Sequence, residues 1–398
     1  MSDFAIASPD VSATPQTPIR NIGILGGGQL AWMLSEVAPS LGLNLYIQTP
    51  NVTDSALQQI KHLREKAVLA PIADATATAQ LAQHCQVITF ENEFVDLEAL
   101  EKLAATGVCF RPSLGSLAPL LDKYVQRTFL ASLGLPVPEF APLETRELPS
   151  PFEFPVAIKT RRHGYDGHGT FICHMVEDLD QCWQQAESDA SVLMVEAYVP
   201  FERELAMMAA RSPTGEISLF PVVETVQRHQ VCHWTMAPVQ LSSTTQKQID
   251  HIATQILEHL DIVGIVGIEL FQTVDDQIWV NEIAPRTHNS GHLTIDACAT
   301  SQFEQHLRAI SGQPLGPTHL TSPAAVMVNL LGFETAQDDY RLKRQAIAAL
   351  PHTRVHWYGK TAARPGRKLG HATILLSSDD PALAVEMAHK VEALWYGD

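Results

Sequence analysis

The sequence predicts a fold of mixed α/β and α+β class, with a Rossmann-like domain first and a small domain last. Residues 20–48 read as strand, glycine-rich turn, helix and strand, which is the βαβ order of a doubly wound sheet. Two apolar runs that each lead to a glutamate, 263–271 and 277–280, are joined by an Asp-Asp turn. A third segment, about 320–398, has short strands and a basic turn. We therefore expect a disordered leader at 1–18 and domains at 19–125, 126–311 and 312–398.

The composition indicates a globular protein with an acidic surface. Of 398 residues, 45% are hydrophobic and 18% charged, and 27 basic against 44 acidic side chains give a formal charge of −17. This charge argues against nucleic acid or an anionic membrane as the main partner. No apolar run approaches the ~18 residues of a membrane span, and no signal peptide begins the chain. Six cysteines without a Cys-x-x-Cys pair favour the reducing cytoplasm, and no zinc-ligand spacing occurs among the histidines.

The glycine-rich turn at Gly26–Gly28 lies between a strand and a helical pattern over 30–41. Such a turn can bring backbone N–H groups to a phosphate at the helix N-terminus. A nicotinamide cofactor is disfavoured, because Gln48-Thr49-Pro50 stands where a dinucleotide site needs an acid. A phosphate of another ligand, or plain helix–sheet packing, explains the glycines. Glu91-Asn92-Glu93 follows the strand 87–90 and is either part of a ligand crevice or an exposed acidic loop.

The next segment carries basic and acidic groups at the ends of strands. Asp122-Lys123 opens a helix that runs to about Leu133, and a strand ends at Lys159 before a glycine-rich loop at 160–170. Backbone N–H groups of such a loop can cover phosphates, although the spacing is not that of a Walker loop and Asp-Gly also occurs in ordinary hairpins. Glu196 on the strand 192–199, and Glu204 beyond it, suit an adenine edge and a ribose, or else salt bridges.

The acidic hairpin is the most informative stretch. Glu269 and Glu282 lie on strands joined by a tight turn, so the two carboxylates are expected side by side, where they repel unless a cation lies between them. Arg286, four residues after Glu282, suits a phosphate. We therefore favour a magnesium site that holds a nucleotide over two carboxylates that point at solvent.

The remainder reads as a helix over 295–310, strands over 325–330 and 353–357, and a basic turn over 360–371. In so acidic a chain, two lysines and two arginines in one turn indicate an anion site, although a solvated basic loop is the alternative.

The order of these motifs resembles the ATP-grasp superfamily. The most specific ones, Asn281-Glu282-x-Ala-Pro-Arg-x-His-Asn-Ser-Gly-His and His-Trp-Tyr-Gly-Lys360 followed by Arg-Pro-Gly-Arg-Lys, are similar to those of the 5-(carboxyamino)imidazole ribonucleotide synthases. The resemblance covers residues 20–380. It implies a ligase that uses ATP and bicarbonate to carboxylate 5-aminoimidazole ribonucleotide through carboxyphosphate in purine synthesis. It also implies two Mg²⁺ ions, with Mn²⁺ as a substitute, and a homodimer.

The resemblance also implies roles for individual residues. The catalytic groups are Arg286, His288 and Lys360. The ATP site comprises Lys123, Lys159, Gly164, Tyr165, Asp166, Gly167, His168, Gly169, Thr170, Glu196, Ala197, Tyr198, Val199, Glu204, Glu224, Asn281 and Glu282. The ribonucleotide site comprises Gly28, Gln29, Leu30, Glu91, Tyr165, Asp166, Arg286, His288, Asn289, Ser290, Lys360 and Arg367. The metal ligands are Glu269, Glu282 and Asn281.

Three positions depart from the pattern of such enzymes. His168 stands where the loop usually has a fixed cation, and Thr170 where it has Gln, so ATP affinity or its pH dependence can differ. Ala284 stands where many ATP-grasp enzymes have a metal-binding Asn, which leaves Asn281 as the nearest amide. Alternative interpretations are a formate-dependent glycinamide ribonucleotide transformylase, a biotin carboxylase, a nicotinamide dehydrogenase and a non-catalytic nucleotide-binding protein.

Overall fold

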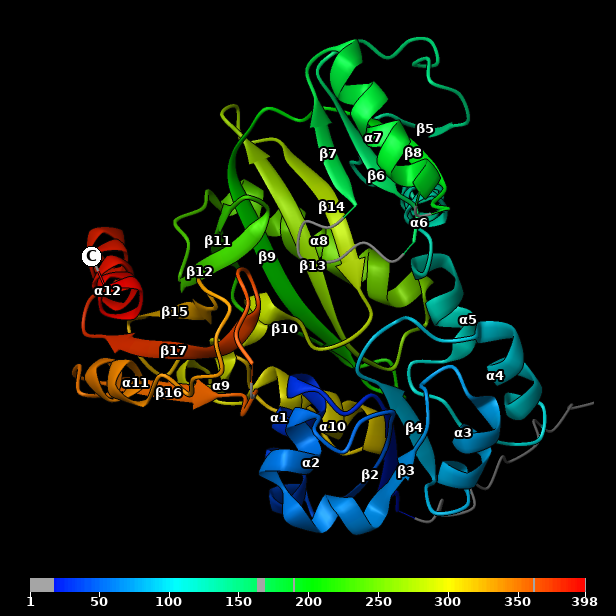
Figure 1. Cartoon of the computed structure of the whole chain (residues 1–398), viewed down its shortest axis with the longest axis vertical. Coiled ribbons are helices and arrows are strands. Elements are labelled where there is room, and N and C mark those ends of the chain that lie inside the picture. Colours follow the sequence, from blue (N-terminus) through cyan, green and yellow to red (C-terminus); the bar gives the residue numbers. More distant parts are fainter. Residues whose placement is uncertain (1–17, 163–168, 189, 361, 398) are drawn as a thin grey trace, which may run out of the picture.

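The computed structural model describes residues 18–162, 169–188, 190–360 and 362–397, which form three sheets (Figure 1). The expected leader, except for Pro18, and the centre of the glycine-rich loop at 163–168 lie outside the described residues. Within the described part, no helix is long and apolar enough to cross a membrane.

The first sheet is parallel, with strand order β3-β2-β1-β4, which confirms the Rossmann-like prediction. Its strands are β1 (Asn21–Leu25), β2 (Asn44–Thr49), β3 (Ala67–Leu69) and β4 (Val87–Phe90). Helices α1 (Gln29–Val37) and α2 (Ser55–Gln59) pack on one face, and α3 (Ala75–Ala82), α4 (Leu97–Ala104) and α5 (Leu114–Leu117) on the other. The chain order changes direction between β1 and β4, so the loops after these two strands border one crevice.

A sheet of antiparallel strands runs through the middle of the molecule, in the order β14-β13-β9-β11-β12-β15-β17-β16, with β10 beside β9. Its strands are β9 (Phe201–Arg211), β10 (Ile217–Leu219), β11 (Val223–Arg228), β12 (Val231–Ala237), β13 (Gly264–Thr273), β14 (Ile278–Ala284), β15 (Ala324–Leu331), β16 (Thr353–Trp357) and β17 (Lys368–Leu376). The last three come from the third segment, and β15 joins β12 through the pair Trp234–Val328. The C-terminal strands thus continue the central sheet. Helices α11 (Arg341–Ala348) and α12 (Pro381–Tyr396) cover them.

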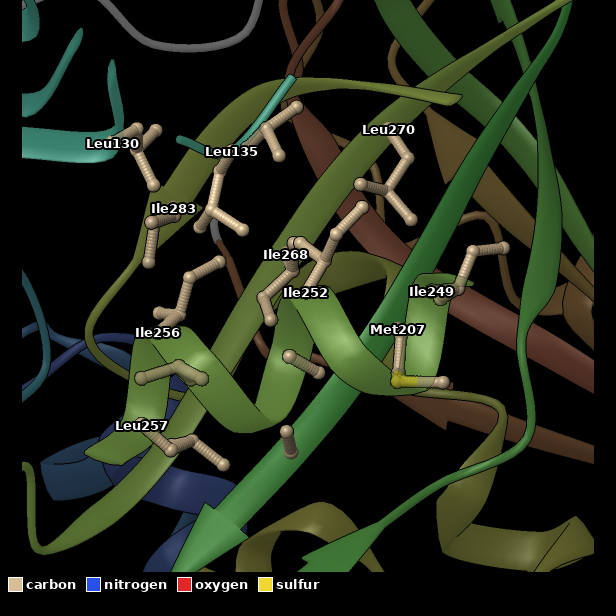
Figure 2. Packing of buried hydrophobic residues seen from close by; sticks show 14 of the residues in the cluster. Leu130, Leu135, Met207, Ile249, Ile252, Ile256, Leu257, Ile268, Leu270 and Ile283 are labelled. Carbon is tan, nitrogen blue, oxygen red and sulfur yellow. The ribbon is translucent and has the colours of Figure 1, made fainter. Parts of the chain in front are cut away.

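Helix α8 (Ser243–His259) covers the other end of this sheet, and Figure 2 shows its packing. Its apolar residues recur at helical spacing, as in Ile249, Ile252 and Ile256, so one stripe of the helix faces the strands. These side chains meet Met207 of β9 and Ile268 of β13, all of them buried. The strands of the acidic hairpin therefore pack against a buried hydrophobic core.

A smaller antiparallel sheet, β5-β8-β6-β7, lies at one end of the molecule (Figure 1). Its strands are β5 (Phe140–Leu143), β6 (Val156–Thr160), β7 (Thr170–Cys173) and β8 (Leu193–Ala197), covered by α7 (Val176–Ser188). Helix α6 (Lys123–Ser132) connects the first domain to it, and Asp122 caps that helix by accepting from the N–H groups of Tyr124 and Val125.

Two predicted helices differ from the structure. The helix expected over 295–310 is divided into α9 (Thr294–Ala297) and α10 (Gln302–Ser311). The break occurs because Cys298 pairs with Leu320 and Ser301 caps α10 through the N–H of Glu304. The helix expected over 30–41 ends as a 3₁₀ turn, η1 (Ala38–Leu41). The other short helices are η2 (Lys61–Lys66), η3 (Ala118–Leu120) and η4 (Asn289–Gly291).

Candidate functional site

One cavity of about 650 Å³ gathers residues from all parts of the fold. The loops after β1 and β4 line one end of it, and the small sheet lines the other. Of the predicted residues, the cavity is lined by Gln29, Leu30, Glu91, Lys123, Lys159, Thr170, Glu196, Ala197, Tyr198, Val199, Glu204, Glu269, Asn281, Glu282, Arg286, His288, Asn289 and Ser290. Residues far apart in the sequence thus meet in one space.

The acidic pair lines this cavity. Glu269 of β13 and Glu282 of β14 are direct cross-strand neighbours, which confirms the predicted hairpin. Burial and the charge of Glu282 raise the pKa of Glu269 to about 7. Burial also acts to raise the pKa of Glu282, but Lys123, whose Nζ lies 2.5 Å from Oε2, lowers it. Two carboxylates that resist ionising together are suited to binding a cation between them.

The donor set fits Mg²⁺. Asn281 adds an amide whose Nδ2 is 3.3 Å from Glu269, and its Oδ1 accepts from Lys159 at 3.2 Å. Among the described residues, no group of three or more His, Cys, Asp or Glu side chains is arranged to hold a metal. Mg²⁺ commonly takes one or two carboxylates and completes its shell with water and substrate phosphates, so two glutamates and an amide are sufficient.

A buried ionic triad supports the lysine at the end of β6. Glu196 accepts from Arg127 at 2.6 Å and lies 2.7 Å from Lys159, with all three side chains almost fully buried. Burial alone would raise the pKa of Glu196, but the charges of Arg127 and Lys159 lower it to about 2. The Glu196 carboxylate therefore orients Lys159. The residues that follow Glu196, from Ala197 to Val199, line the cavity.

The pocket end beside β8 is partly aromatic and carries a glutamate suited to hydroxyl groups. Phe201 and Phe271 stack with ring centroids 4.5 Å apart, and both line the cavity. Glu204 accepts from Gln227 at 2.7 Å. Burial, with a contribution from Glu269, raises the pKa of Glu204 to about 7.

The loop after β14 is held from two sides. Arg286 donates to both carboxylate oxygens of Glu93, at 2.6 and 3.2 Å, and so joins the hairpin to the first domain. His288 lies with Nδ1 2.9 Å from the hydroxyl of Ser290, and with Nε2 3.6 Å from Glu269. The loop thus presents a guanidinium and an imidazole next to the acidic pair.

The glycine-rich turn of the first domain holds a carboxylate of the protein itself. Glu91 accepts from the N–H groups of Gly28, Leu30 and Ala31, at 2.6, 3.0 and 3.3 Å. A Cβ on Gly28 would lie 2.5 Å from Oε1 of Glu91, and one on Gly26 would lie 2.4 Å from Oε2. Glu91 thus occupies the position at the start of α1 that a phosphate would take.

Three regions of the chain match known domain families. Residues 19–118 match the ribonucleotide synthetase preATP-grasp domain, 128–303 the ATP-grasp domain, and 325–384 the phosphoribosylaminoimidazole carboxylase C-terminal domain. The N5-carboxyaminoimidazole ribonucleotide synthase of Synechococcus elongatus is 51% identical over 393 residues, which cover 97% of this chain and 98% of the relative. The chain belongs to the N5-carboxyaminoimidazole ribonucleotide synthase family.

Solved structures of the N5-carboxyaminoimidazole ribonucleotide synthase family have the same fold. The Aspergillus clavatus enzyme complexed with ATP is 30% identical, has a TM-score of 0.88, and matches 95% of this chain and 98% of its own. A complex of that enzyme with ADP and 5-aminoimidazole ribonucleotide is 29% identical, with a TM-score of 0.87 and coverage of 95% and 99%.

Some residues predicted from the resemblance to this synthase family lie elsewhere. Glu224 does not line the cavity among the described residues: its carboxylate lies 3.4 Å from Arg203, and strand alternation instead presents Thr225 and Gln227. Gly28 also does not line it, and acts by holding Glu91. Arg367 donates to the backbone oxygen of Ala362 at 2.6 Å and is likewise not part of the described lining.

Lys360 lies just behind the lining of the synthase-family cavity. Its Nζ donates to the side-chain oxygen of Gln29 at 2.7 Å and to the backbone oxygen of Lys368 at 2.6 Å. Gln29 and Lys368 both line the cavity. Gly164, Tyr165, Asp166, Gly167 and His168 lie outside the described residues. The next residue, Gly169, has φ +83° and accepts from the N–H of Thr160.

Sequence reasoning missed several residues that shape this site of the synthase family. They are Glu93, named only as part of an acidic loop, and Arg127, Gln227, Asn329 and Lys368. Arg127 lies four residues after Lys123 on an amphipathic helix, so helical spacing offered a signal. Glu93 and Asn329 act through contacts 193 and 40 residues away in the sequence, which no local pattern reveals.

Proposed function

We propose that this chain carboxylates the amino group of 5-aminoimidazole ribonucleotide, with ATP as the energy source and bicarbonate as the carbon source, in purine biosynthesis. Membership of the synthase family supports the reaction, and relatives bound to ATP, and to ADP with the ribonucleotide, support the two substrates. The observation that carries the assignment is the single cavity that joins the acidic pair and Lys159 to Arg286 and His288.

The first step forms carboxyphosphate. A bicarbonate oxygen attacks the γ-phosphorus of ATP, and the bond to the β-phosphate oxygen breaks to release ADP. Lys123 and Lys159 hold the phosphates, residues 196–199 the adenine, and Glu204 the ribose. Glu269 and Glu282, with Asn281, would hold Mg²⁺, which neutralises the charge of the phosphates when bound.

The second step transfers the carboxyl group. Carboxyphosphate breaks down to carbon dioxide and phosphate, and the amine of the ribonucleotide attacks the carbon and loses a proton. In this proposal Arg286, His288 and Lys360 bind the carboxyphosphate anion, and one of them takes the proton from the amine. Gln29, Leu30 and the Glu91 turn form the ribonucleotide end. Water must be excluded at this stage, because it hydrolyses carboxyphosphate.

Two further inferences concern the setting of the enzyme. We propose a cytoplasmic location, which the free thiols of all six cysteines support. We also propose a homodimer, on the strength of the family resemblance.

The test measures ADP release from ATP and Mg²⁺, with and without bicarbonate and 5-aminoimidazole ribonucleotide. We expect turnover that needs both, with loss of about 100-fold or more in Glu282→Ala and Arg286→Ala, because each removes charge from the reacting groups. Glu98→Ala is the matched control, since the Glu98 side chain is 82% exposed on α4 and pairs only with Lys102 in the described structure. ADP release that does not depend on the ribonucleotide would contradict the proposed substrate. No ADP release under any condition would contradict the proposed activity.

A further inference from the structure

Three polar side chains form a row across the C-terminal strands. Asn329 of β15 pairs with His371 of β17, and His371 pairs with His356 of β16. Residues paired across adjacent strands point to the same face of a sheet. Asn329 and His371 are fully buried, and His371 stacks on His356 with ring centroids 4.6 Å apart. A buried polar row of this kind is costly unless another element supplies partners.

For Asn329 and His356, hydrogen-bond partners come from the segment that follows the loop after β14, and this segment meets His371 only through a ring contact. Asn289, His292 and Asp296 are spaced by three and four residues over η4 and α9, so they lie on one helical face. Asn289 and Asn329 exchange two amide hydrogen bonds, of 2.9 and 2.7 Å. Asp296 lies 2.8 Å from Nε2 of His356. Between these pairs, the rings of His292 and His371 lie 5.1 Å apart.

The middle pair is fixed by further hydrogen bonds. Gln302 accepts from the N–H of His288 and donates to the backbone oxygen of His288, so its amide orientation is determined. Its Nε2 must then donate to Nδ1 of His292, which places the proton of this neutral imidazole on Nε2. On the other side, the hydroxyl of Tyr358 lies 2.9 Å from Nδ1 of His371. Burial lowers the pKa of both histidines well below the usual range, so both are neutral.

Each side of this arrangement leads to groups of the proposed reaction. His288 directly precedes Asn289, Arg286 lies three residues before it, and Gln302 holds the His288 backbone. On the strand side, Lys368 lies three residues before His371, and its backbone oxygen accepts from Lys360. Tyr358, bonded to His371, lies two residues before Lys360, whose Nζ is 5.5 Å from the Tyr358 ring.

We propose that Asn289, His292 and Asp296 form a polar zipper with Asn329, His371 and His356, and that this zipper holds Arg286 and His288 in register with Lys360. The six are positioning residues, and their role rests on the proposed function of those three groups. If the two sides shift, Arg286 keeps its hydrogen bonds to Glu93, so bicarbonate is still phosphorylated at the acidic pair. Lys360 is displaced from this place, so carboxyphosphate no longer meets the ribonucleotide and is lost to water. The zipper therefore sets how much carboxylated product forms for each ADP released.

The test compares product formation with ADP release in Asp296→Ala and Asn329→Leu. We expect ADP release to stay within about threefold of the parent enzyme while carboxylated ribonucleotide per ADP falls by roughly fivefold or more, since small displacements of reacting groups have large effects on rate. Asp296→Asn keeps an acceptor for His356 and is expected to restore most of the ratio. Thr373→Val is the control, because Thr373 is buried on β17 two residues from His371 and lies outside the zipper.

Thermal unfolding of each variant accompanies the assay, and Asp296→Ala removes the pair nearest the surface, which leaves the buried pairs of the zipper in place. An equal fall in ADP release and product would show a structural role only and overturn the zipper proposal, as would an unchanged ratio in both variants. A parent enzyme that releases ADP but forms no carboxylated ribonucleotide would instead overturn the proposed function.

Discussion

Three cations of the cavity each form an ion pair with a carboxylate of the protein. Lys123 pairs with Glu282, Lys159 with Glu196, and Arg286 with Glu93. An anionic ligand that binds these cations must therefore displace the carboxylates. Its net binding free energy is the difference between its own contacts with the cations and the ion pairs that it breaks. The sequence identified each of these cations, because each follows a strand or opens a helix. It did not identify Glu93 as the partner of Arg286, since 193 residues separate them.

Glu93 provides a prediction about the orientation of Arg286. In Glu93→Ala the guanidinium loses both hydrogen bonds that aim it, so ribonucleotide-dependent turnover is expected to fall by about tenfold. The KM for ATP is expected to change by less than about twofold, because Lys159 and the acidic pair are untouched. Steady-state kinetics measure the turnover and the KM for ATP separately. Glu187→Ala, which breaks the exposed pair with Arg146, is the matched control. A loss expressed wholly in the KM for ATP would contradict this role.

Glu196 gives rise to a pH dependence of stability. Its pKa is about 2 in the folded protein against an ordinary 4.5, so its contribution is fully present above pH 4.5 and is lost as pH falls towards 2. The shift corresponds to roughly 3 kcal/mol. In urea unfolding, Glu196→Gln is expected to be less stable than the parent by about this amount at pH 7, and the difference is expected to narrow between pH 4.5 and 3. A difference independent of pH would contradict the ionic origin.

At the scale of elements, local patterns predicted strands and turns well. The acidic hairpin followed from two apolar runs and a tight turn, and the register of Glu269 with Glu282 is confirmed. The helix predicted over 295–310 was wrong, because the pairing of Cys298 with Leu320 is a tertiary contact that interrupts a continuous helical pattern. The role of the glycine-rich turn in the first domain could not be predicted for the same reason. Glu91, the carboxylate that this turn binds, lies 63 residues from Gly28.

The contact between this turn and Glu91 supplies a prediction for α1. In Gly28→Ala the new Cβ would lie 2.5 Å from the carboxylate, so the helix start or Glu91 must shift. We expect a loss of roughly 1–3 kcal/mol of stability, as for overpacking in a core. Because Gln29 accepts from Lys360, ribonucleotide-dependent turnover should fall as well. Gly115→Ala is the control, since its Cβ would lie 3.9 Å from the nearest atom. Equal melting temperatures for parent and Gly28→Ala would contradict the argument.

At the scale of the whole molecule, the site depends on how the first domain packs against the rest. Leu307 of α10 and Tyr358 of the C-terminal segment belong to the same buried cluster as Ile22, Ile24 and Leu34 of the first domain. The sequence divided the chain into consecutive segments, which reflects the order of the motifs. It did not indicate that α10 and Tyr358 complete the core of the first domain, because the apolar face of one helix does not specify its partner.

This packing leads to a prediction that separates the two substrates. Leu307→Ala removes fully buried side-chain atoms between the first domain and the central sheet, at a cost of about 2–5 kcal/mol. The proposed ATP groups lie on the central and small sheets, whereas Gln29 and Glu91 of the ribonucleotide end lie on the first domain. The KM for the ribonucleotide is therefore expected to rise by about tenfold while ADP binding changes little. Ile256→Ala makes a comparable cavity beneath the central sheet, away from this junction. If both variants raised the KM for the ribonucleotide equally, general loss of stability would explain the effect and domain packing would not.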